Sequence, residues 1–181
     1  MKQREKVVPA ARGRVLEIGI GSGLNLPYYD PSRIERLWGL DPSPEIWSLA
    51  SGRVAGAPLS VEFLEAAAEA IPLDAHSADT VVVTYTLCSV ADVESVLSEV
   101  RRVLRPGGEV LFCEHGLAPD ESVRKWQERL NPAWRKLGGG CNLNRDIPGF
   151  LRRGGFDIRV LEAEYIPGWR PASFTYWGVA V

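Results

Sequence analysis

Short apolar runs alternate with longer amphipathic stretches along most of the chain. The runs are bounded by glycine, proline or aspartate, which is typical of parallel strands that are buried on both faces. They predict strands at residues 14–19, 34–41, 60–64, 79–85 and 109–115. Helices are predicted at residues 44–50, 92–104, 121–135 and 146–153, the second of these from apolar side chains that recur at helical spacing.

The two ends of this pattern carry additional features. After the first strand, a glycine-rich turn at residues 19–23 is expected to lead into a short helix that ends at residues 28–31, Tyr-Tyr-Asp-Pro. Residues 156–165 and 172–181 predict two further strands, joined by Ile-Pro-Gly-Trp-Arg-Pro, in the manner of an antiparallel pair. The whole pattern predicts one doubly wound, Rossmann-like α/β domain over residues 1–181.

Composition excludes several classes of partner. The 181 residues are 45% hydrophobic and 24% charged with a net charge of −2, so no nucleic acid partner is expected. No apolar run reaches about eighteen residues, so no transmembrane segment is predicted and a cytoplasmic location is expected. Cys88, Cys113 and Cys141 show no CxxC spacing and are predicted to be reduced thiols. Because the only histidines are His76 and His115, no metal site is predicted.

The stretch from Glu17 to Gly23 is the most informative motif. It places glycines at 19, 21 and 23 between a strand and a predicted helix, where they allow a ligand to approach the backbone closely. A dinucleotide-binding fingerprint needs a third glycine where Leu24 stands, and a phosphate-binding P-loop needs a Gly-Lys-Ser/Thr sequence that does not occur. An acid two residues before alternate glycines resembles the pattern of class I methyltransferases, which implies S-adenosylmethionine as cofactor.

Each part of S-adenosylmethionine has a candidate partner. Glu17 is expected to orient the methionine ammonium, directly or through water, and Asp41 to accept hydrogen bonds from the ribose hydroxyls. Amides at the start of the predicted helix would favour the carboxylate. The full set of candidate cofactor-binding residues is Glu17, Gly19, Gly21, Gly23, Asn25, Asp41, Pro42, Ala68, Glu69, Thr86 and Cys88. The alternative is purely structural: a surface charge at Glu17, a helix cap at Asp41 and an ordinary glycine turn.

The adenine end of the site departs from the usual pattern. In many relatives an aspartate that contacts the adenine amino group stands at the position of Ala67. The pocket is therefore expected to use the backbone near Ala68, apolar walls and Glu69. The alternative for Glu69 is a solvated charge at a helix end.

Later motifs narrow the resemblance. The segments RVLRPGG (102–108) and AEAIPL (68–73) are similar to those of the quinone-biosynthesis C-methyltransferases. TLCSV (86–90), FCEH (112–115), NPAW (131–134) and GCNLNR (140–145) resemble the animal microsomal alkyl thiol methyltransferases and their bacterial relatives. This methyltransferase-11-type resemblance implies a seven-stranded sheet of order 3-2-1-4-5-7-6 with an antiparallel last strand. It also implies methyl transfer to a small thiol, with S-adenosylhomocysteine as product.

Two departures from these relatives affect the expected site. The animal enzymes carry a hydrophobic N-terminal anchor, and relatives usually have about two dozen residues before the first strand, where this chain has thirteen before Arg14. The site is therefore expected to be more open, or to be completed by a partner subunit or by the substrate, or the sequence is a shortened one. A monomer or a weak homodimer is expected.

The methyl acceptor is expected beyond the ends of the fourth and fifth strands. His115 is the candidate catalytic residue, because it could take a proton from a thiol or hold its thiolate; the alternative is a histidine bonded to a loop carbonyl. Trp126, Trp134 and Trp169 lie in segments that would roof an apolar acceptor pocket, and the glycine-rich loop 138–145 could move.

Three other functions stay open on the sequence alone. A quinone-type C-methyltransferase would act on a quinol precursor in place of a thiol. A cofactor-binding domain without turnover would bind S-adenosylmethionine and give no product. A nicotinamide oxidoreductase would need to tolerate Leu24 in the position of the third glycine.

Overall fold

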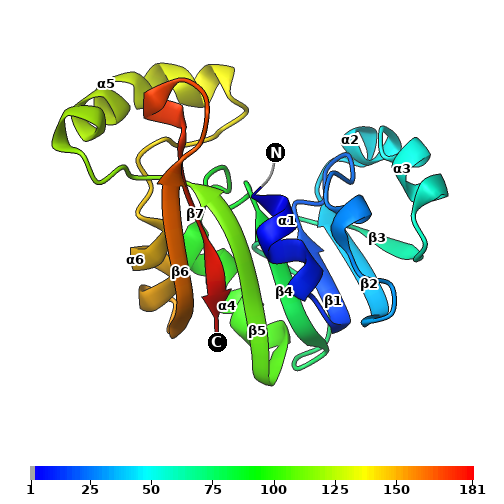
Figure 1. Ribbon diagram of the computed structural model, residues 1–181. Coiled ribbons are helices and arrows are strands. Elements are labelled where there is room, and N and C mark those ends of the chain that lie inside the picture. The colour runs from blue at the N-terminus through cyan, green and yellow to red at the C-terminus, as the bar shows by residue number, and fades with distance from the viewer. Residues whose placement is uncertain (1–2) are drawn as a thin grey trace.

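The computed structural model describes residues 3–181 and contains a seven-stranded sheet (Figure 1). The strand order β3-β2-β1-β4-β5-β7-β6 is the order expected from the sequence. The first five strands are parallel, and β7 pairs antiparallel with both β5 and β6. The strands are β1 (Gly13–Ile18), β2 (Ile34–Asp41), β3 (Val61–Glu65), β4 (Ala78–Thr84), β5 (Leu104–His115), β6 (Ile158–Tyr165) and β7 (Phe174–Ala180).

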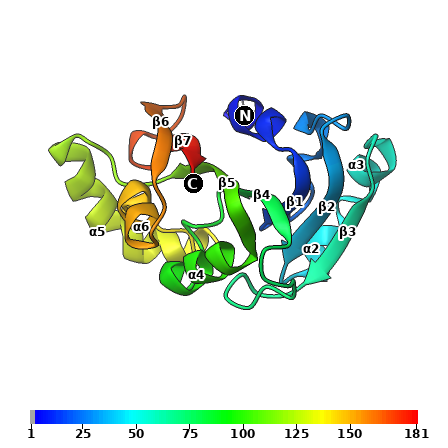
Figure 2. The same ribbon diagram turned by 90° about the horizontal axis from the view of Figure 1, so that it is seen from below.

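Helices cover both faces of the sheet, as Figure 2 shows from below. Successive residues of a strand point to opposite faces, so Val82 packs in one core cluster while Val81 and Val83 pack in the other. One face is covered by α4 and α6, and the other by α1 and the segments around α2 and α3. The α-helices are α1 (Arg4–Val7), α2 (Pro44–Ser48), α3 (Ser51–Gly56), α4 (Val93–Val103), α5 (Glu121–Leu137) and α6 (Ile147–Arg153).

The short helix predicted after the glycine-rich turn is present only as the 3₁₀ helix η2 (Leu26–Tyr28). Residues 21–25 before it form successive turns and no α-helix. Gly21 and Gly23 have φ values of +49° and +72°, which no right-handed helix contains, and Pro27 lacks a backbone amide. The amides that would have favoured a carboxylate at a helix start are therefore not arranged in that way.

Two other boundaries differ from the prediction. The helix expected at residues 44–50 divides into α2 and α3, with the Ser43 hydroxyl as the cap that accepts the Ile46 amide at 3.2 Å. Helix α4 ends at Val103 as expected, but Arg-Pro-Gly-Gly (105–108) does not separate it from the next strand. Those residues form an irregular start of β5, where the register with β4 shifts and Gly107 adopts φ +78°.

Helix α5 lies across the end of the sheet formed by β5, β6 and β7 (Figure 1). Its buried Gln127 attaches it there: the side-chain amide donates to the carbonyls of Gly116 and Pro171, each at 3.0 Å, and accepts the Ala118 amide. Within residues 3–181, no helix combines the length and the apolar character needed to cross a membrane. Helix α5 is therefore fixed beside the carboxyl end of β5 and covers that part of the sheet edge.

Candidate functional site

The glycine-rich turn lies tightly against the end of β4. Gly19 has φ +70°, and a side chain there would meet the Thr86 hydroxyl, which lies 2.2 Å from the position of a Cβ atom. That hydroxyl donates to the carbonyl oxygen of Ile18 at 3.1 Å. Only glycine therefore satisfies both the backbone conformation and the close approach at position 19.

Beneath this turn lies a buried polar network that includes Glu17. Its carboxylate accepts hydrogen bonds from Asn25 Nδ2 at 2.9 Å and from the Tyr29 hydroxyl at 2.7 Å. Arg4 of α1 donates to Asn25 Oδ1 at 2.6 Å and to Thr84 Oγ1 at 2.7 Å. Burial raises the pKa of Glu17 to about 7, against the hydrogen bonds and the nearby guanidinium, which lower it. Glu17 thus holds the turn and Arg4 together rather than facing open space.

Asp41 at the end of β2 holds the same turn from its other side. One carboxylate oxygen accepts the Gly21 amide at 2.9 Å and the other accepts the Ser43 amide at 3.0 Å. Each oxygen keeps a further lone pair that is free to accept another hydrogen bond. Asp41 is 8% exposed, so such a partner would bind in a largely buried position.

A mainly apolar cavity of about 210 Å³ opens beside the turn. Among the predicted cofactor residues, it is lined by Gly19, Pro42, Ala68, Glu69 and Thr86. Ile18, Leu40, Ala67, Val90 and Ala91 complete the wall. The predicted residues from the ends of three strands and from the 66–73 segment therefore meet around one cavity.

The loop after β4 forms the far wall of this cavity and is fixed by one buried carboxylate. Glu114 accepts the backbone amides of Thr86, Leu87 and Cys88 at distances between 2.7 and 3.2 Å. The loop begins at Tyr85, whose φ of +54° is rare for a bulky residue. The chain thus turns sharply away from the sheet and is then held by the adjacent strand.

On the other side of this loop, Cys88, His115 and Cys141 converge. One side-chain donor atom from each residue lies within 4.8 Å of the others, and Cys141 Sγ lies 3.1 Å from His115 Nε2. The neighbouring Cys88 thiol and then His115 lower the pKa of Cys141 despite partial burial. The pKa of His115 is raised by Cys141 and Glu114, although burial alone would lower it. Within residues 3–181, the hydrogen-bond partner of the His115 ring is therefore the Cys141 sulfur and not a loop carbonyl.

The three tryptophans that were expected to roof the acceptor pocket behave differently from one another. Trp134 is half-buried, and its ring lies 5.6 Å from that of Trp169. Trp126 is 54% exposed and stands beside Arg129 on the outer side of α5. Trp134 and Trp169 together could form an apolar cover over the Cys141 segment, whereas Trp126 does not contribute to it.

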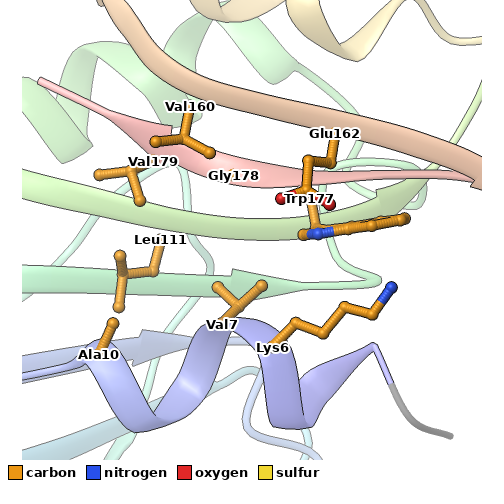
Figure 3. A pocket seen from close by; sticks show the side chains of 9 residues that line it. All are labelled: Lys6, Val7, Ala10, Leu111, Val160, Glu162, Trp177, Gly178 and Val179. Atoms are coloured by element: carbon orange, nitrogen blue, oxygen red, sulfur yellow. The ribbon is translucent and has the colours of Figure 1, made fainter.

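A separate hollow of about 150 Å³ lies between α1 and the strands β5, β6 and β7 (Figure 3). Its lining is largely aliphatic, with the Lys6 ammonium 3.8 Å from the centre of the Trp177 ring and Glu162 nearby. None of the predicted site residues lines it. We therefore assign the chemistry to the cavity beside the glycine turn and to the cysteine–histidine cluster.

Several site residues were not singled out from the sequence. Arg4 belongs to α1, a short helix before β1 that no apolar periodicity in the sequence predicts. Its side chain is nevertheless part of the hydrogen-bond network of Glu17. From the sequence, Cys141 is predicted only as a reduced thiol, and Asn142 stands out only as part of the motif GCNLNR. That motif, together with NPAW, was the available signal, because Asn131 Oδ1 accepts the Leu143 amide at 2.8 Å and so joins the two motifs.

Comparisons with known proteins give three findings. A family model described as a methyltransferase domain matches residues 16–112, which run from β1 to β5. The chain is 38% identical to the thiol S-methyltransferase TMT1A of Homo sapiens over 96% of this chain and 72% of that protein. It is 37% identical to TMT1B of Homo sapiens, with shares of 97% and 74%.

A solved structure shows the same fold. The S-adenosylmethionine-dependent methyltransferase from Mesorhizobium loti superposes with a TM-score of 0.72 at 22% identity, over 98% of this chain and 95% of that one. At this level of identity the likeness concerns the fold alone. The relatives from Homo sapiens extend the similarity beyond the family match into the segments that carry Cys141 and α5.

Proposed function

Because the chain belongs to the class I S-adenosylmethionine-dependent methyltransferases, we propose that it transfers the methyl group to a small alkyl thiol. The single observation that carries this proposal is the position of the loop 85–90. It has the cavity beside the glycine turn on one side and the cluster of Cys88, His115 and Cys141 on the other. A donor and an acceptor bound on the two sides would meet at the carboxyl ends of β4 and β5.

The residues around the cavity fit the nucleoside part of S-adenosylmethionine. Asp41 has free lone pairs for a ribose hydroxyl, and the apolar walls from Leu40, Ala67 and Ala68 suit a flat aromatic base. Glu69 lines the same cavity and is available for the adenine amino group. Gly19 lets the ligand approach the backbone without a side chain in between.

The buried network beneath the turn fits the amino acid part. Arg4 is 8% exposed, and its Nε atom has no hydrogen-bond partner within residues 3–181. A carboxylate is the partner that such a buried guanidinium atom favours. We assign the methionine carboxylate to Arg4 and the ammonium to the region of Glu17 and Asn25, whose side-chain oxygens can accept its hydrogen bonds.

When bound, S-adenosylmethionine supplies an activated methyl carbon. The acceptor sulfur, as a thiolate, would take this methyl group as its bond to the sulfonium sulfur breaks, which would leave S-adenosylhomocysteine. The thiol proton must leave before or during the attack, and His115 stands where it could take that proton or stabilise the thiolate. A C-methyl transfer to a quinol precursor is not favoured, because the relatives that match nearly the whole chain are named thiol S-methyltransferases.

Calorimetric titration with S-adenosylhomocysteine, followed by a product assay, tests this function. We expect binding that Asp41→Ala weakens by about tenfold or more, because hydrogen bonds to a charged group are lost. Asp30→Ala is the matched control, since Asp30 only bonds the neighbouring Ser32 and lies before β2, away from the cavity. The affinity of Asp41→Asn for S-adenosylhomocysteine should lie between those of Asp41→Ala and Asp30→Ala, because asparagine keeps one acceptor oxygen.

The product assay decides among the alternatives. Mass spectrometry should detect the methyl thioether when a short alkyl thiol is supplied and no methylated product when a quinol precursor is supplied. Binding without any product would favour a cofactor-binding domain without turnover. Binding of NAD in place of S-adenosylhomocysteine would overturn the assignment of the glycine turn.

A further inference from the structure

We propose that Cys88, His115 and Cys141 form a binding site for one zinc ion. Two thiols and one imidazole are the donor set that this borderline metal prefers. Tetrahedral zinc with typical bond lengths would hold such donor atoms roughly 3.5–3.8 Å apart. The three donor atoms here already lie within 4.8 Å of one another, so shifts of about an ångström would bring them to one centre.

The residues that carry the two cysteines are fixed to each other. The carbonyl oxygen of Cys88 accepts the backbone amide of Asn142 at 2.8 Å and its side-chain amide at 2.9 Å. Arg145, from the same segment as Cys141, donates to the carbonyls of Leu87 and Val90. The loop after β4 and the segment 141–145 therefore form one unit, and the ligand pair does not depend on a chance approach of two side chains.

His115 is held by the strand that also fixes the Cys88 loop. It is the last residue of β5, directly after Glu114, which accepts the amides of residues 86–88. Its ring packs against the Tyr85 ring at 5.8 Å, which limits its orientation. Hydrogen bonds thus join the segments that carry Cys88 and Cys141, and His115 directly follows Glu114, which bonds the Cys88 loop. The three ligands are held in place, as preorganised metal sites require.

Three protein ligands leave one tetrahedral position for a further ligand, as in catalytic zinc sites. Resting on the proposed function, we assign this position to the sulfur of the acceptor thiol. Zinc would then take the place of His115 as the group that stabilises the acceptor thiolate, and the proton would leave to solvent on binding. This part deepens the acceptor assignment, whereas the metal site itself stands without it.

Cobalt(II) titration of the full chain tests the metal site. The protein is stripped with a chelator, kept reduced with a phosphine that binds no metal, and followed by visible absorption. We expect one equivalent of cobalt to give the intense thiolate-to-metal band and the ligand-field bands of a tetrahedral site, and zinc to displace it. Absence of these bands, or binding weaker than millimolar, would overturn the proposal.

Variants identify the ligands. Cys88→Ser, His115→Ala and Cys141→Ser should each weaken cobalt binding by about a hundredfold or more. Cys113→Ser is the matched control, because Cys113 is also a buried free cysteine but is not part of the cluster. An unchanged far-ultraviolet circular dichroism spectrum shows that each variant is folded, and unchanged cobalt spectra in both cysteine variants of the cluster would contradict the assignment.

Addition of an alkyl thiol to the cobalt-loaded protein tests the fourth position. A shift of the charge-transfer band that saturates with thiol supports the thiolate as fourth ligand. An unchanged spectrum together with thiol methylation would overturn only this part. A cobalt site in a protein that methylates no thiol would leave the metal site standing and remove the proposed acceptor.

Discussion

The amino-terminal side of the site and its carboxy-terminal side are built in different ways. On the amino-terminal side, Glu17, Asn25 and Asp41 lie within one strand-turn-strand unit; Glu17 bonds Asn25, and Asp41 bonds the Gly21 amide of the same turn. The cysteine–histidine cluster instead unites positions 88, 115 and 141, which three separate segments supply. A ligand site made by one local unit can be read from spacing, whereas one made by distant segments depends on the packing of the whole sheet.

The largest expected effect comes from Glu114, the residue that joins the two sides. Three backbone N–H groups donate to the Glu114 carboxylate, and in Glu114→Gln the side-chain NH₂ group, which cannot accept, would face at least one of them. We expect the free energy of unfolding in urea to fall by about 3 kcal/mol, because buried donors lose a charged acceptor.

Glu109→Gln is the control on the same strand. Glu109 pairs with Arg12, whose side chain is 56% exposed, so this change should cost less than about 1 kcal/mol. Equal costs for the two variants would mean that the Glu114 contacts are not what fixes the loop 85–90, and the proposed connection between the two sides would fail.

A smaller effect should distinguish the buried network of the amino-terminal side. The pKa of Glu17 is raised to about 7 by burial, so the folded state disfavours its ionised form. Below the unfolded-state pKa of Glu17, both states are protonated and the group does not lower the free energy of unfolding. As the pH rises toward about 7, the unfolded state ionises while the folded state stays protonated, so the free energy of unfolding falls. Between about pH 5 and pH 8 the stability of the native protein, measured relative to Glu17→Gln, should fall by roughly 2 kcal/mol.

Urea unfolding of both proteins at the two pH values provides the measurement. Tyr29 and Arg4 are the other titratable groups that face Glu17, and both stay in the variant. Glu62→Gln, which removes an exposed carboxylate paired with Arg36, controls for the loss of one charge. A stability difference between native protein and Glu17→Gln that does not change with pH would contradict the burial of this carboxyl group.

The smallest expected effect concerns the cover of the acceptor side. Trp134→Ala should raise the KM for an apolar thiol by about fivefold, since about 1 kcal/mol of aromatic contact would be lost. Trp126→Ala is matched in chemistry and helix but removes an exposed ring, so its KM should change less than about twofold. Equal effects on KM, or an effect of Trp134→Ala on S-adenosylhomocysteine binding, would remove Trp134 from the acceptor pocket.

The sequence was sufficient for the central strands because they are short, mostly apolar runs with clear boundaries, and the family resemblance implied their order. It failed at residues 21–25, where the positive φ values of Gly21 and Gly23 prevent the α-helix that a Rossmann-like pattern predicts. It placed Gly19, Pro42, Ala68, Glu69 and Thr86 in one candidate set, and the structure brings these five together around one cavity. The prediction of their role as cofactor ligands stays a prediction.

The interaction of Cys141 with His115 could not be predicted from spacing. Twenty-five residues separate them, including the whole of α5, and neither segment has a periodic pattern that aligns it with the other. The same is true of Arg4, whose neighbours Asn25 and Thr84 are 21 and 80 residues away. The expectation that no metal site exists rested on histidine number and separation in sequence, which do not measure distance in the fold.

The antiparallel direction of β7 has a practical consequence for single-molecule and surface experiments. Because β7 runs opposite to β5, its last residue lies at the edge of the sheet remote from α5 and from the loop 85–90 (Figure 1). The backbone of Val181 is bonded to that of Asp157 there, which anchors the final residue. A fluorophore or a surface tether attached at Val181 would leave the sheet edge with α5 and the loop 85–90 facing outward. One attached near Arg4 would lie beside the hydrogen-bond network of Glu17.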